Sequence, residues 1–206
     1  MDQRMVINAI TTNLTINKTQ HSIRGKNFTE NLSKRIANIL RHTAKECGLA
    51  MDNEGFVNID ELLKYLNSNS KWSDISINDI NNVIQNIPKK RFELKENKIR
   101  AYYGHSFAEK IVKMESIPPH ILYHGTSHEA VEQILKSGLY SQKRQYVHLS
   151  AEKDTAISVG KRKDANPIIL IVDTLSAIKD GIKFYFGNQT VWLSDNIPAK
   201  YLKVLK

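Results

Sequence analysis

Two adjacent prolines, Pro118 and Pro119, mark the strongest change of pattern in this sequence. Before them, apolar residues recur at helical spacing, whereas after them short apolar runs typical of strands alternate with short helical ones. Adjacent prolines favour a boundary, because neither can continue a helix or a central strand. The pattern predicts an α+β fold with a polar extension over residues 1–27, one lobe over residues 28–117 and a second lobe over residues 118–206.

The first lobe opens with a long amphipathic segment, NLSKRIANILRHTAKECG, which predicts a helix over residues 31–48. Gly48 stands where the C-terminal cap of that helix belongs. Cys47 is the only cysteine of the chain, and it falls on the apolar stripe, where we expect it to be buried as a small hydrophobe. A single cysteine excludes an internal disulfide and a cysteine-rich zinc site.

Two shorter helices and a hairpin are predicted in the rest of the first lobe. Asp60 is expected to cap the second helix, and Ser76 with Asp79 resembles a capping box for the third. A turn over residues 96–98 joins two strand-like runs, which predicts a hairpin. Three helices followed by a hairpin is the order of a winged-helix module, and we predict that class for this lobe.

The second lobe is predicted to contain a mixed or antiparallel sheet. Ser127 is expected to cap a helix that ends at Gly138, and DTAISVG predicts another short helix. ILYHGT is expected to form a strand and a turn, and the further expected strands, in chain order, are YVHLS, PIILIV, FYF and TVWLS. PIILIV is apolar throughout, as is typical of a strand in the interior of a sheet.

An excess of basic residues narrows the classes of partner. The chain has 30 Lys and Arg against 21 Asp and Glu, which gives a formal net charge of +9 and a pI near 9.5. Such an excess favours a nucleic acid, a phosphorylated cofactor or an anionic membrane, although a solvated basic surface is the alternative. The sequence has no apolar run long enough for a signal peptide or a membrane span, so we expect a cytoplasmic protein.

Basic side chains in the first lobe are candidates for binding phosphate. Arg41 and His42 are adjacent near the end of the first predicted helix, where they can meet one ligand at the helix edge. The alternative is a surface arginine beside a half-buried histidine. Arg91 opens the first hairpin strand and Arg100 lies in the second; a guanidinium offers a planar fork of donors that matches phosphate oxygens. The Gly-His-Ser sequence at residues 104–106 suits close approach to a ligand.

The second lobe adds polar groups at strand ends. The His-Gly-Thr sequence at residues 124–126 follows a predicted strand and can approach a ligand closely, with a plain turn as the alternative. Arg144 precedes a strand over residues 146–150, on which Tyr, His and Ser share one face. No motif indicates a Rossmann site, a P-loop, a metal site or a Ser-His-Asp triad.

Taken in order, these segments resemble the RNA 2′-phosphotransferase (tRNA 2′-phosphotransferase) family. The resemblance covers about residues 31–194 and is carried by LSKRIANILRHTAKECGL, EGFVNIDELL, KKRFEL, IRAYYGHS, YHGTS, ILKSGL, RQYVHLS and TVWLS. It implies a winged-helix lobe joined to an ADP-ribosyltransferase-like lobe, with NAD in the second lobe and RNA between the two.

The resemblance also implies a reaction in two steps. The 2′-phosphate of RNA attacks the nicotinamide ribose of NAD and expels nicotinamide, which gives a 2′-phospho-ADP-ribosyl RNA intermediate. The adjacent ribose 2″-hydroxyl then attacks the phosphate, which frees the RNA 2′-hydroxyl and forms ADP-ribose 1″,2″-cyclic phosphate. NAD is consumed as a co-substrate, and no metal is needed.

The matching segments imply site residues by position. The implied catalytic set is Arg41, His42, Arg91 and Arg144, with Arg100 as the alternative for the third member. The implied NAD-binding set is His124, Gly125, Thr126, His148 and Ser150. The residues implied less directly for the substrate phosphate are Arg100, His105 and Ser106.

Three positions depart from the commoner family pattern, at Thr43, at residues 102–103 and at residues 189–190, and all leave the charged groups in place. Three alternatives stay open: an ADP-ribosyltransferase acting on terminal phosphates of nucleic acid, a non-catalytic winged-helix nucleic-acid-binding regulator, and a family member that binds without turnover. We expect 2′-phosphorylated RNA and NAD as partners, with tRNA as one candidate, no membrane contact and a monomer.

Overall fold

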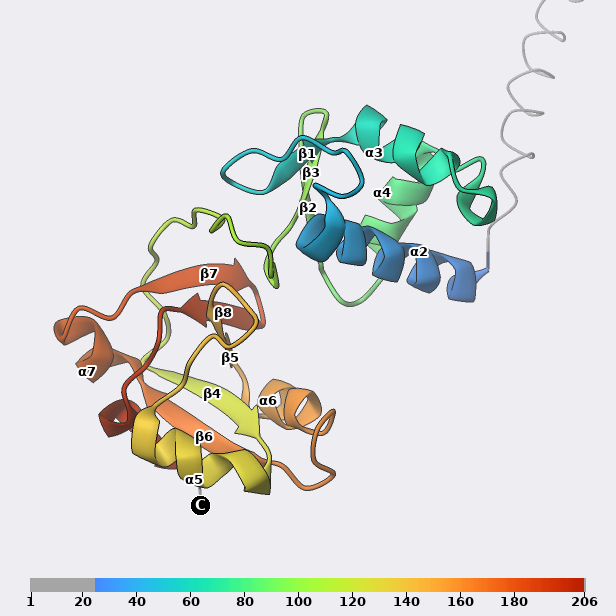
Figure 1. Ribbon diagram of the computed structural model, residues 1–206. Helices are drawn as coiled ribbons and strands as arrows, with labels where there is room; N and C mark the ends of the chain where they lie inside the picture. Colours follow the sequence, from blue (N-terminus) through green and yellow to red (C-terminus); the bar gives the residue numbers. More distant parts are fainter. Residues whose placement is uncertain (1–24, 206) are drawn as a thin grey trace, which may run out of the picture.

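The structure, a computed structural model, describes residues 25–205 as an α+β protein (Figure 1). Two lobes carry the regular elements: an N-terminal lobe (residues 25–101) and a C-terminal lobe (residues 121–205), joined by a connecting segment (residues 102–120). Residues 1–24 of the predicted extension lie outside the described residues. Among residues 25–205, no helix has both the length and the apolar character needed to cross a membrane.

The N-terminal lobe has three α-helices and a small antiparallel sheet in the order β1-β3-β2. In chain order its elements are α2 Lys26–Asn38, the π-helical turn η1 Ile39–Thr43, β1 Phe56–Asn58, α3 Ile59–Asn67, the 3-10 turn η2 Ser70–Trp72, α4 Ile77–Asn86, β2 Phe92–Lys95 and β3 Lys98–Ala101. The predicted order of three helices and a hairpin is confirmed. The winged-helix class of this lobe stays a prediction.

The first helix begins earlier than its apolar pattern predicts. It starts at Lys26, five residues before the expected Asn31, because Phe28 packs against the core and extends the buried face. The α-helix also ends earlier than predicted, at Asn38, and continues as the π-helical turn η1 and a turn over residues 44–48. The predicted glycine cap closes that turn: Gly48 has φ +70°, its N–H donates to the Lys45 carbonyl (3.0 Å), and the Leu49 N–H donates to the Ala44 carbonyl (2.9 Å). This pair of bonds is a Schellman motif.

Side-chain caps mark the N-terminal ends of the other two α-helices of this lobe, α3 and α4. The predicted capping box of Ser76 and Asp79 is present. The predicted cap at Asp60 is wrong, because β1 ends at Asn58 and α3 follows at once. The Asn58 side chain therefore accepts the hydrogen bonds from the first helical N–H groups, while the Asp60 carboxylate accepts one from Asn97 (2.6 Å).

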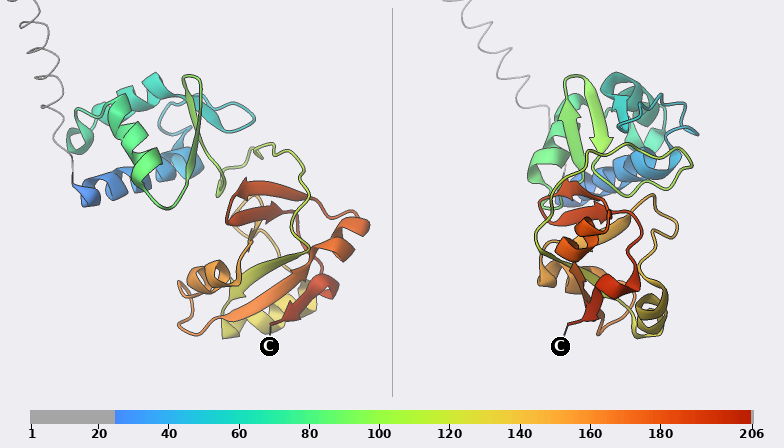
Figure 2. Two further views of the ribbon diagram at one scale, coloured as in Figure 1. Left: turned by 180° about the vertical axis from the view of Figure 1, so that it is seen from behind. Right: turned by 90° about the vertical axis from the view of Figure 1, so that its left-hand side faces the viewer.

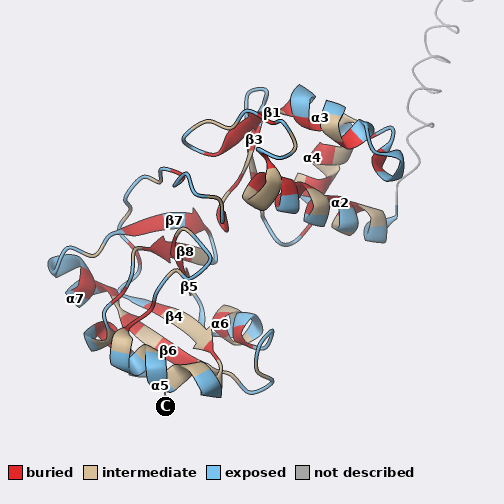
Figure 3. Ribbon diagram, viewed as in Figure 1, coloured by how far each residue is buried: buried red, intermediate tan, exposed pale blue. Residues whose placement is uncertain are grey.

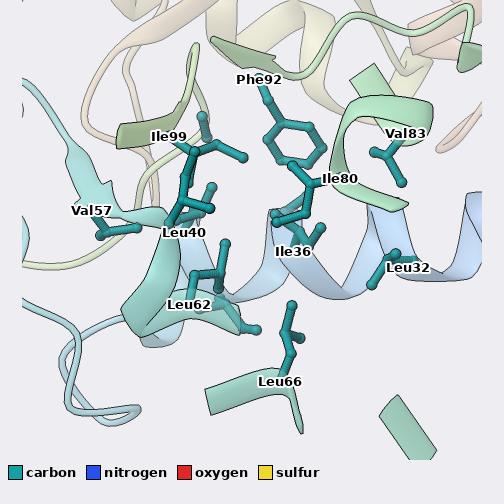
Figure 4. Packing of buried hydrophobic residues seen from close by; sticks show 14 of the residues in the cluster. Leu32, Ile36, Leu40, Val57, Leu62, Leu66, Ile80, Val83, Phe92 and Ile99 are labelled. Carbon is teal, nitrogen blue, oxygen red and sulfur yellow. The ribbon is translucent and has the colours of Figure 1, made fainter. Parts of the chain in front are cut away.

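One hydrophobic core holds the three helices against the sheet. Figure 4 shows side chains of α2, α3 and α4 meeting those of β1, β2 and β3. The fully buried ones include Leu32, Ile36, Leu40, Leu62, Leu66, Ile80 and Ile99. Cys47 is only partly buried and packs against this core, so the expectation of full burial is wrong.

The C-terminal lobe is built on a six-stranded antiparallel sheet in the order β7-β8-β5-β4-β6-β9. Its elements are β4 Ile121–Thr126, α5 His128–Ser137, β5 Val147–Ser150, α6 Lys153–Gly160, β6 Ile168–Asp173, α7 Thr174–Lys179, β7 Phe184–Asn188, β8 Val191–Ser194, the 3-10 turn η3 Ala199–Tyr201 and β9 Leu202–Val204. The antiparallel alternative of the prediction is confirmed, and β6 is interior, as PIILIV indicates. Helix α7 has no counterpart in the sequence prediction.

The β7–β8 side of this sheet faces the N-terminal lobe (Figures 1 and 2). β7 is an edge strand, yet most of its residues are buried, as Figure 3 shows. The reason is a cluster in which Tyr103 of the connecting segment packs with Tyr146, Tyr185 and Leu193. The Asn188 side chain adds a hydrogen bond from the end of β7 to the Lys90 carbonyl (2.9 Å). These contacts position the two lobes around a cleft.

Candidate active site

A cleft of about 1540 Å³ is lined by side chains of both lobes and of the connecting segment. The residues that line it and bear on chemistry are Arg41, Lys89, Tyr103, His124, Thr126, Arg144, His148, Ser150, Arg162 and Asn188. Six of them were predicted from the sequence as site residues, and they come from segments far apart in the chain. The fold therefore brings one group of predicted residues together in a single cavity.

Arg41 is carried by the π-helical turn η1 and lies over the ring of Tyr103, 5.2 Å from its centroid. Its Nε and Nη2 atoms are buried and have no hydrogen-bond partner among the described residues. Burial, with the charges of the nearby Arg144 and Arg91 and against the opposing effect of Tyr103, lowers the pKa of Arg41 to about 10. Donors without acceptors at a buried cation are the arrangement expected of an anion site.

Arg144 reaches the same place from the C-terminal lobe. Its Nη1 donates a hydrogen bond to the carbonyl of Gly104. Gly104 has φ +95°, and a Cβ atom at this position would lie 2.6 Å from Arg144 Nη1 and 3.3 Å from Arg41 Cδ. The absence of a side chain at Gly104 is therefore what allows the two arginines to converge.

His42, the neighbour of Arg41, points to the connecting segment. Its Nδ1 lies 2.7 Å from Ser106 Oγ, and the Ser106 N–H donates to the Arg41 carbonyl (3.1 Å). Burial, then the charges of Arg144 and Arg41, lower the pKa of His42 below its usual value. A neutral imidazole near pH 7 can accept a proton or a hydrogen bond.

The two predicted hairpin arginines lie in different surroundings. Arg91 stands just before β2, donates to Ser33 Oγ (3.2 Å), and is close enough to affect the pKa of Arg41. Burial lowers the pKa of Arg91 itself. Arg100 on β3 is instead held by Glu93 (2.6 Å) and Glu54 (3.3 Å), with its guanidinium carbon 4.3 Å from the Phe56 ring centroid. Arg91, and not Arg100, is therefore among the charges that act on Arg41, although neither of these two arginines lines the cleft.

His148 and His124 lie on neighbouring strands at the floor of the cleft. His124 Nδ1 donates to the carbonyl of His148 (3.0 Å), and His148 Nδ1 donates to the carbonyl of Tyr146 (2.9 Å). These bonds place the proton of each neutral ring on Nδ1 and leave Nε2 as an acceptor. His148 Nε2 is buried without a partner among the described residues. Burial, with the charge of Arg144, lowers the pKa of His148 to about 4, and burial also lowers the pKa of His124.

The His-Gly-Thr sequence ends strand β4 instead of following it, because Thr126 still pairs with Ile168 of β6. Thr126 is buried and lines the cleft, as does Ser150 of β5. Gly125 does not line it. A Cβ atom at Gly125 would lie 2.1 Å from the backbone oxygen of Ala156, so this glycine is required where β4 meets α6. Its role in binding NAD stays a prediction.

His105 lies behind the cleft, in the connecting segment. It is buried, its ring centroid is 5.5 Å from that of Phe107, and its Nε2 has no partner among the described residues. Burial, with the charge of Lys113 and others, lowers the pKa of His105 to about 3. His105 and Ser106 do not line the cavity, but Ser106 contacts His42.

With this geometry described, comparison with known proteins identifies the family. A family model described as "RNA 2'-phosphotransferase, Tpt1 / KptA family" matches residues 27–196. The chain belongs to this family. A relative from Acetivibrio thermocellus, named "Probable RNA 2'-phosphotransferase", is 49% identical over 172 residues, which cover 84% of this chain and 94% of the relative.

Two further relatives of the RNA 2′-phosphotransferase family bear the same name. The protein of Bacillus thuringiensis subsp. konkukian is 49% identical over 179 residues, which cover 87% of this chain and 97% of the relative. The protein of Thermococcus kodakarensis is 36% identical over 167 residues, which cover 81% of this chain and 92% of the relative. The match therefore includes both lobes and the cleft between them.

Four of these ten cleft residues escaped the sequence prediction of site residues in this RNA 2′-phosphotransferase family member: Lys89, Tyr103, Arg162 and Asn188. Tyr103 packs between Arg41 and His148, whose ring centroid is 5.7 Å away. Its only signal in the sequence is its place among the departures from the family pattern. Arg162 and Asn188 lie outside every quoted motif, and only the approach of the lobes brings them to the cleft.

That the reaction needs no metal stays a prediction. Among residues 25–205, no three side chains of the His, Cys, Asp or Glu type gather into a group that could hold a metal ion. The chemical groups of the cleft are guanidinium, ammonium, imidazole, hydroxyl and amide groups, with one carboxylate, that of Asp154. This set of donors suits a phosphorylated ligand.

We expect Arg91→Ala to reduce phosphotransferase activity at least about tenfold more than Arg100→Ala does, since of the two only Arg91 acts on the pKa of Arg41 and only Arg100 is held by carboxylates. Arg100→Ala is expected to lower the melting temperature, because it leaves Glu93 and Glu54 without their cation and removes the contact with Phe56. Initial rates and thermal unfolding of both variants check this. The assignment is wrong if Arg100→Ala costs more activity at a temperature where both variants are folded.

The buried histidines predict a loss of stability in acid. His148 and His105 have pKa values of about 4 and about 3 in the folded chain, against about 6.5 when unfolded. The unfolded chain therefore binds more protons below about pH 6.5, and the free energy of unfolding falls as the pH decreases toward 4. As the pH decreases toward 4, the melting temperature should fall less for His148→Gln than for the wild type. The exposed His120→Gln is the control, and an equal fall in all three proteins would contradict the prediction.

Proposed function

We propose that this chain is an NAD-dependent RNA 2′-phosphotransferase, which moves an internal 2′-phosphate of RNA, of the kind left at a tRNA splice junction, to the ADP-ribose part of NAD. The observation that carries the proposal is the approach of Arg144 to Arg41 at Gly104, with two buried nitrogens of Arg41 unpartnered among the described residues and Arg91 close enough to lower the pKa of Arg41. Gathering three cations costs electrostatic free energy, and a bound phosphate dianion offsets that cost.

The three guanidinium groups suit both the binding and the transfer of a phosphate. Among residues 25–205, no carboxylate forms an ion pair with Arg41, Arg91 or Arg144. Arg91 Nη1 donates to Ser33 and Arg144 Nη1 donates to Gly104. The other guanidinium donors, including Nε and Nη2 of Arg41, suit phosphate oxygens, which a guanidinium binds in a bidentate manner. Fixed donors orient the phosphate for reaction and stabilise the charge that develops on it during transfer.

His42 supplies a group that can exchange a proton beside this phosphate site. Its lowered pKa keeps the imidazole neutral near pH 7, and Ser106 fixes the ring through Nδ1. A neutral ring in this place can accept a hydrogen bond or a proton from a reacting hydroxyl. We assign this role to His42.

The cleft has groups that suit NAD. The buried Nε2 of His148 is an acceptor without a partner among the described residues, and Thr126 and Ser150 present hydroxyl groups to the same cavity. The cavity, at about 1540 Å³, exceeds the volume of an ordinary small-molecule pocket, as a dinucleotide and an RNA strand together require. When bound, NAD supplies the ADP-ribose that accepts the phosphate, and nicotinamide is its leaving group.

A short RNA with one internal 2′-phosphate tests the proposal, with and without NAD. We expect the phosphate to leave the RNA only when NAD is present, with release of nicotinamide and formation of ADP-ribose 1″,2″-cyclic phosphate. Loss of phosphate without NAD, or RNA binding without release of nicotinamide, would contradict the proposal. Nicotinamide release with a terminally phosphorylated RNA alone would favour an ADP-ribosyltransferase instead.

A further inference from the structure

Three successive residues ahead of β5 hold the connecting segment against the C-terminal lobe. Arg144 Nη1 donates to the carbonyl of Gly104. The backbone N–H of Gln145 donates to the carbonyl of His105 (3.2 Å), and the hydroxyl of Tyr146 donates to the carbonyl of Ile111 (2.8 Å). These bonds hold residues 104, 105 and 111, and so fix the two ends of the segment over residues 104–111.

The side chain of Gln145 makes three further bonds to this segment. Its Nε2 donates to the carbonyl of Phe107 (3.0 Å) and to that of Glu109 (2.7 Å), while its Oε1 accepts the N–H of Ile111 (3.0 Å). Both N–H donors of the amide and its oxygen are thereby used. Gln145 does not line the cleft, and its side-chain bonds all go to backbone atoms of the connecting segment.

The same segment also holds the residues of the N-terminal lobe that face the phosphate site. Ser106 lies next to the bonded carbonyl group of His105. Its Oγ is 2.7 Å from His42 Nδ1, and its N–H donates to the backbone carbonyl of Arg41 (3.1 Å). Residues 104–111 thus connect Arg41 and His42 on one lobe to Arg144 on the other.

We infer that Gln145 is a positioning residue, which fixes residues 104–111 and so sets the placement of Arg41 and His42 relative to Arg144. The inference rests on the proposed function, because the reaction is its main readout. Gln145 touches no reacting atom. Its effect on the rate follows from geometry, since a displacement of about 1 Å between catalytic groups costs a reaction up to about 100-fold.

Two substitutions test this role. Gln145→Ala removes all three side-chain bonds, whereas Gln145→Glu keeps the acceptor for Ile111 but turns a carboxylate oxygen toward the carbonyls of Phe107 and Glu109. At pH 7.5 we expect both variants to lose about tenfold or more in kcat, with KM for RNA and for NAD changed by less than about threefold.

A pH profile separates positioning from a general loss of structure. Carbonyl oxygens around the new carboxylate favour its protonated form, which regains one donor. The ratio of the Gln145→Glu rate to the wild-type rate should therefore rise as the pH falls toward about 5.5, while the Gln145→Ala ratio stays low. Gln85→Glu, on the exposed face of α4, is the control for the added charge. If Gln145→Ala is unfolded at the assay temperature, recovery of Gln145→Glu in acid still decides the question.

The outcomes distinguish this inference from the proposed function. Wild-type protein that removes no 2′-phosphate overturns the proposed function, and the placement is then measured by calorimetry with inorganic phosphate. In that case Gln145→Ala should bind phosphate about tenfold more weakly than the wild type, because Arg41 and Arg144 no longer converge. A folded Gln145→Ala protein with kcat within twofold of wild type overturns the inference. Where no reaction occurs, a phosphate affinity within twofold of wild type overturns it.

Discussion

Replacing Arg144 by alanine is expected to lower kcat for removal of the 2′-phosphate by about 100- to 1000-fold, as does the loss of one fixed donor to a developing anion in other enzymes. Arg144 is held by Gly104 and is close enough to Arg41 to lower its pKa, so its loss leaves the phosphate with fewer fixed donors. Arg144→Lys keeps the charge but not the planar fork of donors, so its activity should lie between those of wild type and Arg144→Ala. Single-turnover rates with 2′-phosphorylated RNA and saturating NAD measure the effect.

Arg35 provides the matched control for this experiment. It is an arginine of the N-terminal lobe, which lies on α2 and donates to the hydroxyl of Tyr65 (3.1 Å), away from the cleft. Arg35→Ala should therefore keep the rate within about twofold of wild type at a temperature where it is folded. A folded Arg144→Ala protein with a rate as high as that of Arg35→Ala would remove Arg144 from the proposed site.

Local features of the fold were predictable from the sequence, because their causes lie within a few residues. The glycine cap at Gly48 and the capping box of Ser76 and Asp79 are set by neighbours three to five positions away. Where two local signals compete, the sequence pattern is less secure. Asp60 is a good capping residue, yet Asn58 caps the helix, because the end of β1 decides where α3 can begin.

Long-range packing limited the prediction of the site. Arg91 and Arg100 both lie in family-like segments, and a choice between them needs the pairing of β2 with β3, which sets Glu93 opposite Arg100. The role of Gly104 likewise depends on the approach of Arg144 from the other lobe. The sequence shows which residue types suit a phosphate site, but which of these residues lie near one another depends on contacts across the two lobes.

Gly125 shows the same limit and gives the prediction with the largest effect on stability. The sequence favours close approach to a ligand, whereas the structure packs α6 against this residue, with Ala156 oxygen 2.1 Å from the position of a Cβ atom. Backbone atoms cannot swing away as a side chain does, so Gly125→Ala must displace α6 from β4. Overpacking of this kind costs about 3 kcal/mol, which for a chain of this size lowers the melting temperature by about 6–12 °C. Calorimetry or circular dichroism during heating measures the fall.

Gly181→Ala separates this steric effect from backbone strain. Gly181 has φ +86° but no heavy atom within 4 Å of a Cβ position, so alanine there meets conformational strain alone. That strain costs about 1 kcal/mol, or about 2–4 °C. Gly125 has no positive φ, so its larger loss must come from contact with α6. If Gly125→Ala melts no lower than Gly181→Ala, the packing of β4 on α6 is not what requires glycine, and the ligand-binding role indicated by the sequence becomes the better explanation.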